Sequence, residues 1–144
     1  SEKSFWDVIK LSKAPIICSH SSSMAMCKHD RNLTDEQLKA LAQNGGVAQV
    51  CLLDRYINED YKNASLTDAI EHIDHMVKVA GIDHVGIGSD FDGGGGIIGC
   101  ESDNDFIQIT VKLIEKGYTE EDIAKIWGGN LMRVLDEVQA TASV

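Results

Sequence analysis

The chain has 144 residues, 43% of them hydrophobic and 25% charged, and a formal net charge of −10 at pH 7. This length and composition are those of one globular domain that can bury a core. This charge disfavours nucleic acid and anionic membranes as partners, because binding to either requires clustered Lys and Arg side chains. There is no apolar run of membrane-spanning length and no signal-peptide pattern, so a cytoplasmic location is expected.

Short apolar runs alternate along the chain with amphipathic segments, which predicts strands and helices in turn. Most of the helices begin with a Ser or Thr followed three residues later by an acidic residue or Gln, which is the pattern of a capping box. The first half of the chain predicts a helix over residues 4–11 opened by Ser4, a strand over 14–18, a helix from Thr34 to the glycines at 45–46, and a strand over 47–53. The second half predicts a helix from Ser65 to Gly81, a strand over 85–88, helices that begin after Ser102 and Thr119, and a last helix over 130–138.

The three apolar strands indicate a parallel sheet in an α/β fold. Continuous apolar strands separated by amphipathic helices are typical of parallel sheets whose faces are covered. The strands start about 32 and about 37 residues apart, which suits right-handed β-α-β units. Three strands leave two unpaired edges, so this sheet is predicted to be part of a larger one.

Polar side chains follow each of the three predicted strands. The carboxyl ends of parallel strands meet at one edge of a sheet, where catalytic and binding residues gather in α/β proteins. Taken singly, a histidine or an aspartate here also fits a structural or loop residue, but their recurrence after all three strands favours an active-site rim. The residues are His20 after the first strand, Asp54, Arg55 and Tyr56 after the second, and Asp90 and Asp92 after the third.

A second cluster, on the predicted helix over residues 66–80, has metal-ligand chemistry at helical spacing. It contains His72, Asp74 and His75. At about 100° per residue, His75 and Glu71 point away from the apolar stripe and His72 lies at its margin. A solvated helix face is therefore predicted in preference to a metal site.

Two further patterns do not indicate a binding site. The glycine run at residues 93–96 lacks the Gly-Lys-Ser/Thr ending of a phosphate loop, so nucleotide binding is not expected. The four cysteines show no C-x-x-C spacing, and they are expected to be reduced, buried thiols.

Four stretches of the sequence resemble the membrane (renal) dipeptidase family, which are zinc peptidases of the metal-dependent hydrolase superfamily. They lie in the family's order and span nearly the whole chain. The segment over residues 72–75 is also similar to the family, where it is structural. The four stretches are Ser19-His20-Ser21-Ser22, Arg31-Asn32-Leu33-Thr34-Asp35, Gly86-Ile87-Gly88-Ser89-Asp90-Phe91-Asp92-Gly93 and Gly129-Asn130-Leu131-Met132-Arg133-Val134.

The resemblance implies a (β/α)₈ barrel with two zinc ions at its carboxyl face. Residues 1–144 would be a single C-terminal half-barrel segment that carries the sixth, seventh and eighth strands. His20 then corresponds to a zinc ligand, and Asp90 to the acid that handles the proton of the metal-bound water. Arg31 corresponds to the residue that binds the terminal carboxylate of the substrate, and Tyr56 is expected beside the substrate.

The function implied by the resemblance is zinc-dependent hydrolysis of dipeptides by the parent protein. The family's other metal ligands lie in an N-terminal half that this sequence does not contain, and a single histidine does not hold a zinc ion. The isolated chain is therefore expected to be inactive. Two alternatives stay open: a non-catalytic half-barrel that associates through its free edges, as in a homo-oligomer, and a metal-dependent hydrolase of a non-peptide amide.

Overall fold

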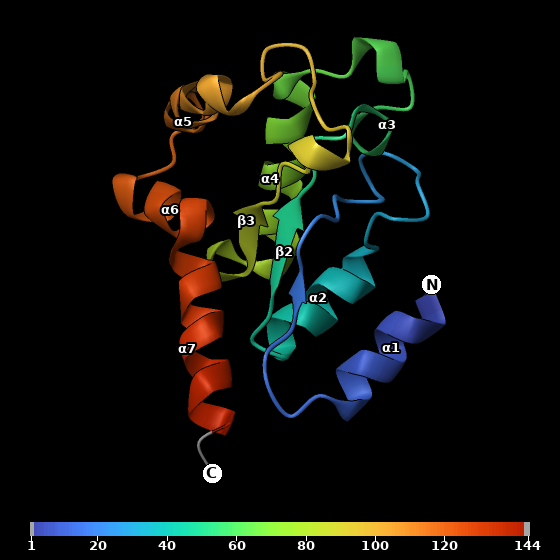
Figure 1. The fold of residues 1–144 in the computed structure, drawn as a ribbon, viewed down its shortest axis with the longest axis vertical. Coiled ribbons are helices and arrows are strands. Elements are labelled where there is room, and N and C mark those ends of the chain that lie inside the picture. Colours follow the sequence, from blue (N-terminus) through green and yellow to red (C-terminus); the bar gives the residue numbers. More distant parts are fainter. Residues whose placement is uncertain (1, 143–144) are drawn as a thin grey trace.

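A computed structural model describes residues 2–142 as a small parallel sheet with helices around it (Figure 1). The first half of the chain forms α1 (Glu2–Leu11), β1 (Ile17–Cys18), α2 (Asp35–Gln43), β2 (Val47–Val50) and α3 (Asp54–Ile57). The second half forms α4 (Leu66–Ala80), β3 (Val85–Ile87), α5 (Phe106–Glu115), α6 (Glu120–Ala124) and α7 (Asn130–Ala142). Within these described residues, no helix is both long and apolar enough to cross a membrane.

Three of the capping residues identified in the sequence start α-helices as predicted. Thr34, Ser65 and Thr119 each accept a hydrogen bond from the backbone N–H three residues later, and the side chain at that position bonds back to the cap. The same box at Ser102 opens a short 3₁₀ turn directly before α5. The prediction that Ser4 opens the first helix is wrong, because α1 already begins at Glu2.

The three strands pair in the order β1-β2-β3, all parallel, as the sequence predicts. They are shorter than the apolar runs that contain them, because the flanking backbone groups bond elsewhere. The N–H of Ile16 donates to Asn44 Oδ1 at 2.8 Å, before β1 begins. The N–H of Leu52 donates to the Ser89 carbonyl oxygen at 2.9 Å, beyond the end of β2. Contacts with neighbouring loops therefore replace regular strand pairing before the start of β1 and beyond the end of β2.

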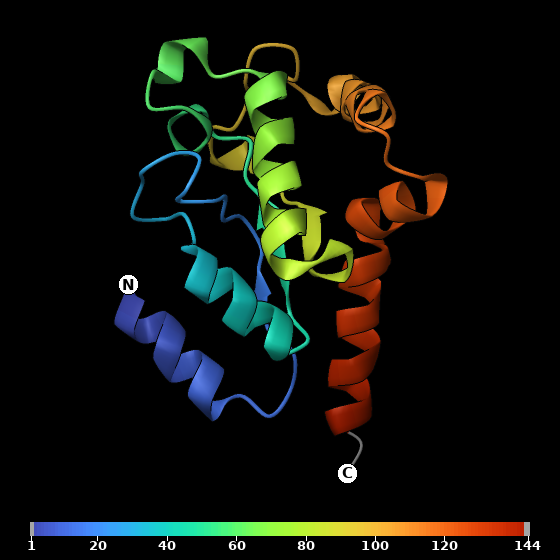
Figure 2. The same ribbon diagram turned by 180° about the vertical axis from the view of Figure 1, so that it is seen from behind.

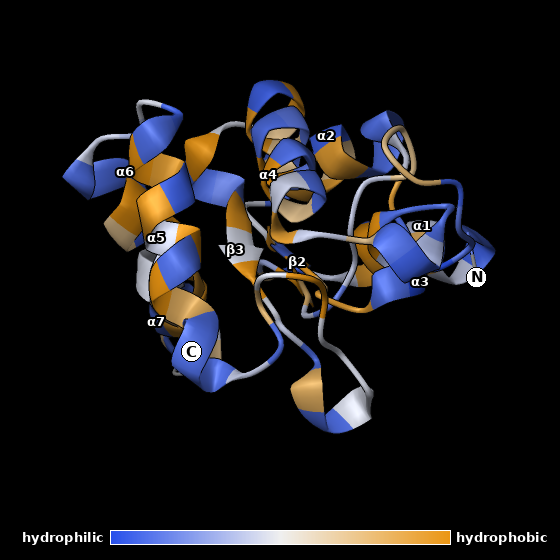
Figure 3. Cartoon of the chain, turned by 90° about the horizontal axis from the view of Figure 1, so that it is seen from above, coloured by the Kyte–Doolittle hydropathy of each residue, from blue (hydrophilic) through white to orange (hydrophobic). Residues whose placement is uncertain are grey.

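The core lies between the sheet and the helices that cover one of its faces. Helices α2 and α4 lie behind the sheet in Figure 1 and in front of it in Figure 2. Hydrophobic residues line the strands and the side of α4 that faces them (Figure 3). The buried residues of this core include Leu38, Leu41, Ala48, Val50, Ile70, Ile73, Met76 and Val85.

On the opposite face, the carboxyl ends of β1 and β3 approach each other closely across β2. Gln49 lies on this face, and its Nε2 donates to the Ile87 carbonyl oxygen at 3.1 Å. Gly88 packs so tightly against Ser19 that a Cβ at this position would overlap the Ser19 carbonyl oxygen. The absence of a side chain at Gly88 is therefore what lets the loops after β1 and β3 converge.

We expect Gly88→Ala to lower the free energy of unfolding by about 1–3 kcal/mol, because the methyl group forces the Ser19 backbone, directly after β1, away. The matched control is Gly86→Ala, on β3 two residues earlier, where the atoms nearest to a Cβ are in the flexible Gln49 side chain, at 3.2 Å, and the Ile126 carbonyl oxygen, at 3.4 Å. Urea unfolding of both variants measures the difference. Equal losses in the two variants would contradict the close approach at Gly88.

Candidate active site

Hydrogen bonds connect the segments that follow the three strands, and Asp90 is the residue of the predicted rim that takes part in them. The segment after β1 is joined to β2 by a hydrogen bond from the Ser21 N–H to the Gln49 carbonyl oxygen, at 2.9 Å. Ser22 Oγ then bonds to both the N–H and the carbonyl oxygen of Cys51, each at 3.2 Å. The Cys51 Sγ lies 3.7 Å from Asp90 Oδ2. These contacts connect the ends of all three strands.

Asp90 lies in a turn that the following glycines make possible. Its φ of 68° is left-handed, and it is the one non-glycine residue between residues 2 and 142 with a positive φ. Its carbonyl oxygen accepts hydrogen bonds from the Gly93 and Gly95 N–H groups, at 3.0 and 2.9 Å. A Cβ on Gly93 would overlap Asp90 Oδ1. The glycine run therefore folds back on Asp90, with Gly93 packed against its carboxyl group.

The Cys51 thiol is a buried group within this edge. Cys51 is 0% exposed. Its pKa is raised to about 12, mainly because of this burial. The nearby Asp90 charge raises this pKa further, and the Arg31 charge opposes the rise. Cys51 is therefore a neutral S–H donor at physiological pH. As expected from the sequence, all four cysteines are free; Cys18 is half-buried and the other three are buried.

His20 follows β1 and is half-buried, with its Nδ1 2.8 Å from Ser19 Oγ. It is the residue that the resemblance assigns to a zinc ion. A protein zinc site takes three or four ligands. Among the described residues, no three His, Cys, Asp or Glu side chains are grouped so that they could hold a metal ion. The donors of this chain alone therefore do not fit a complete metal site.

Arg31 and Tyr56, both predicted to contact substrate, lie beside each other. The Arg31 guanidinium carbon is 5.8 Å from the centre of the Tyr56 ring, a cation–π arrangement. The Tyr56 ring also packs against His29, with 4.3 Å between ring centres. His29 Nδ1 accepts a hydrogen bond from the Arg31 N–H at 3.2 Å. Sequence reasoning missed His29, although its position two residues before Arg31 was the available signal.

The loop that carries Arg31 is held by two buried polar side chains. Asn32 Nδ2 donates to the carbonyl oxygens of Cys27 and Tyr56, at 2.9 and 2.8 Å. His72 Nδ1 accepts from the Ser23 N–H at 3.0 Å, and its Nε2 lies 3.0 Å from the Ile57 carbonyl oxygen. Asn32 and His72 therefore tie the loop to α3 and α4.

The prediction of a solvated face is wrong for His72, which is only 1% exposed. Both of its ring nitrogens contact backbone groups of other segments, at Ser23 and Ile57. The periodicity of the helix does not predict such contacts. The metal-site alternative does not hold for this helix either, since His75 pairs with Asp35, with Nε2 2.7 Å from Oδ1. Burial lowers the pKa of His72, so its ring is neutral in the folded state.

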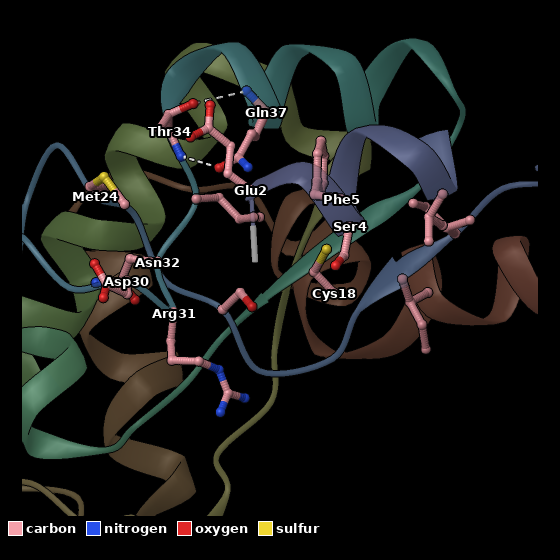
Figure 4. A pocket seen from close by; sticks show the side chains of 15 residues that line it. Glu2, Ser4, Phe5, Cys18, Met24, Asp30, Arg31, Asn32, Thr34 and Gln37 are labelled. Carbon is pink, nitrogen blue, oxygen red and sulfur yellow. Dashed lines mark hydrogen bonds between the residues drawn. The ribbon is translucent and has the colours of Figure 1, made fainter. Parts of the chain in front are cut away.

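A cavity of about 430 Å³ lies between α1, β1 and the loop that carries Arg31 (Figure 4). Phe5 and Val8 of α1 line it on one side, and Ile17 and Cys18 of β1 on another. Arg31 also lines this cavity, and in Figure 4 its guanidinium group points away from α1. The other predicted site residues are not among its lining residues. The strand edge and the cavity are thus adjacent features that share Arg31.

The chain belongs to the membrane dipeptidase family. Residues 1–144 match the family described as "Membrane dipeptidase (Peptidase family M19)". The chain is 41% identical to Dipeptidase ataJ of Aspergillus terreus, over 99% of this chain and 35% of that protein. It therefore spans about a third of the length of this curated relative, and the family implies a metal cofactor.

Solved structures agree with this assignment. The probable dipeptidase PvdM from Pseudomonas aeruginosa superposes with a TM-score of 0.91 at 31% identity, over 97% of this chain and 49% of that one. A metallo peptidase from Rhodobacter sphaeroides, liganded with a phosphinate mimic of the dipeptide L-Ala-D-Ala, gives 0.90 at 31% identity, over 95% of this chain and 40% of that one. The predicted fold class is confirmed, and the three parallel strands match part of a larger dipeptidase fold.

We expect His72→Gln to lower the free energy of unfolding by about 1–3 kcal/mol, because it disturbs the bonds to the Ser23 N–H and the Ile57 carbonyl oxygen. The His72 contribution in the wild type depends on pH. It is complete above the ordinary histidine pKa of about 6.5, and it is lost as the pH falls toward the lower folded value, because the unfolded state binds the proton first.

Urea unfolding at several pH values measures this contribution. The wild type should lose stability between neutral and acidic pH more steeply than His72→Gln. Parallel pH profiles for the two proteins would contradict a buried neutral His72.

Proposed function

We propose that this chain is the C-terminal part of a zinc-dependent dipeptidase with a (β/α)₈ barrel, and that the complete protein hydrolyses dipeptides. The observation that carries the proposal is the gathering of Asp90, Cys51 and the His20 segment at the carboxyl edge of three parallel strands. This is where the active sites of parallel barrels lie. The family match and the ligand of the Rhodobacter sphaeroides relative support a dipeptide as the substrate.

Exposed apolar residues support the proposal that further strands and helices of a barrel pack against this chain. They flank both edges of the sheet, on α1 and β1 at one side and on α7 at the other (Figure 1). Leu11 is the most exposed, at 80%. Covering these residues with the remaining strands and helices of the barrel also pairs the two free sheet edges. The residues are Val8, Leu11, Ile17, Met132, Leu135 and Val138.

The proposed roles follow from the chemistry of each side chain. The Arg31 fork binds the C-terminal carboxylate of the dipeptide through two parallel hydrogen bonds, and Tyr56 fixes the position of Arg31. Asp90 takes a proton from the attacking water and returns it to the leaving amine. His20 supplies one imidazole ligand to the metal site.

We propose zinc as the metal, with two ions in the complete site. Since this chain contributes too few donors, the other ligands come from the rest of the barrel. The isolated chain is therefore expected to lack dipeptidase activity. Restoration of activity by Zn²⁺ after chelation, in the complete protein only, would support this division of the site.

We expect Asp90→Asn in the complete protein to lower kcat for dipeptide hydrolysis by about 10²- to 10⁴-fold, because the amide cannot accept the proton. Asp92→Asn is the matched control, since Asp92 is exposed and lies two residues further along the same loop. Steady-state kinetics with a dipeptide measures both variants. An Asp90→Asn protein with the activity of the wild type would overturn the proposed role.

We expect Arg31→Ala to raise KM for dipeptides by about 10- to 100-fold, because the variant loses a hydrogen-bonded charge pair with the substrate carboxylate. A dipeptide with an amidated C-terminus should show little further loss in this variant. Arg55→Ala is the control, because Arg55 is exposed and its one ion pair among residues 2–142 is with the adjacent Asp54, at 3.8 Å. If Arg31→Ala discriminates between free and amidated dipeptides as the wild type does, the carboxylate is bound elsewhere.

The same kinetic assay separates the dipeptidase from a hydrolase of other amides. A panel of linear dipeptides and cyclic amides is compared at equal enzyme concentration. Faster turnover of the cyclic amides would favour the alternative substrate class.

A further inference from the structure

Cys51 lies in the middle of the proposed site but has none of the roles described above. We propose that Cys51 is a positioning residue whose thiol holds the Asp90 carboxylate in its working orientation. The inference rests on the proposed function, since it gives Asp90 the part of the proton-transferring group. It adds a residue from β2 to a site otherwise built from the segments after β1 and β3.

The Cys51 backbone is fixed from one side. Its N–H and its carbonyl oxygen both bond to Ser22 Oγ, each at 3.2 Å, and Ser22 is itself fully buried. This double contact ties the residue directly after β2 to the loop after β1. The Cys51 backbone, from which the thiol extends, is therefore held in place by the loop after β1.

The Cys51 side chain reaches the third strand. Its Sγ is 3.7 Å from Asp90 Oδ2, within the distance of a sulfur hydrogen bond. Burial keeps Cys51 protonated, so the thiol donates and the carboxylate accepts. A thiol is a weak donor. It can direct the carboxylate without removing the negative charge that proton transfer requires.

The Asp90 carboxylate needs a hydrogen-bond partner, because the backbone conformation of Asp90 does not determine the orientation of its side chain. The left-handed φ of 68° and the two bonds from the glycine loop fix the main chain of Asp90. Its Oδ1 packs over Gly93, which offers no side chain. Within residues 2–142, Cys51 Sγ is the side-chain group that hydrogen-bonds to the Asp90 carboxylate, and no second one is found.

The test uses the complete dipeptidase with three variants: Cys51→Ala, which removes the donor; Cys51→Ser, which keeps a donor; and Cys100→Ala as the control. Cys100 is also fully buried, but its neighbouring charges are Asp103 and Asp105, not Asp90. We expect Cys51→Ala to lower kcat by about tenfold, the value of one hydrogen bond, with KM nearly unchanged. Cys51→Ser should retain most of kcat, and Cys100→Ala should retain all of it.

Three results would overturn the inference: a wild-type kcat in Cys51→Ala, no rescue by Cys51→Ser, or an equal loss in Cys100→Ala. In the Asp90→Asn background, Cys51→Ala should cause no further loss, because the two residues act as one unit. If Asp90→Asn is itself fully active, the proposed function fails. If only Cys51→Ala is silent, the proposed function stands and the positioning role falls.

A second measurement does not depend on activity. The infrared S–H stretching band of Cys51, assigned as the band lost in Cys51→Ala, should lie at lower frequency than that of Cys100, because a hydrogen bond weakens the S–H bond. In Asp90→Ala, the Cys51 band should move to higher frequency. Equal frequencies for both thiols in the wild type would contradict the contact with Asp90.

Discussion

The close packing of Gly88 against the Ser19 carbonyl oxygen is the constraint on which the site depends. A side chain at Gly88 would hold the ends of β1 and β3 apart, and the segments that carry His20 and Asp90 would separate with them. The convergence leaves the end of β2 between its neighbours, where Cys51 contacts both the Ser22 loop and Asp90. A backbone requirement at one glycine thus sets the geometry of functional groups on three strands.

Polar groups in the surrounding loops keep their positions through buried hydrogen bonds rather than through regular secondary structure. Asn32 and His72 satisfy backbone groups of the segment between β1 and α2, and this segment presents Arg31 next to Tyr56. Such bonds contribute more to precision than to net stability, since each replaces a bond to water. Buried hydrogen bonds of Asn32 and His72 therefore hold the loop of the candidate site, next to the apolar core.

Patterns local in the sequence predicted the fold well. The capping boxes at Thr34, Ser65, Ser102 and Thr119 and the three parallel strands were confirmed, but the helix start at Ser4 was not. The expectation that His20 and Asp90 lie at one edge follows from strand polarity alone. Contacts between distant residues were not predictable. His72 is buried because it meets backbone groups 49 and 15 residues away, and Cys51 meets Asp90 from 39 residues away. Helix α3, separated from the end of β2 by three residues, is one short turn without a side-chain cap, so the sequence carries no signal for it.

The most direct test is a crystal structure of the complete protein with a phosphinate dipeptide mimic of the kind bound by the Rhodobacter sphaeroides relative. We predict that the carboxylate of the mimic lies within hydrogen-bond distance of the Arg31 guanidinium, that its phosphinate group faces Asp90, and that His20 binds a metal ion. A mimic that binds away from the edge formed by His20, Cys51 and Asp90 would contradict the proposed site.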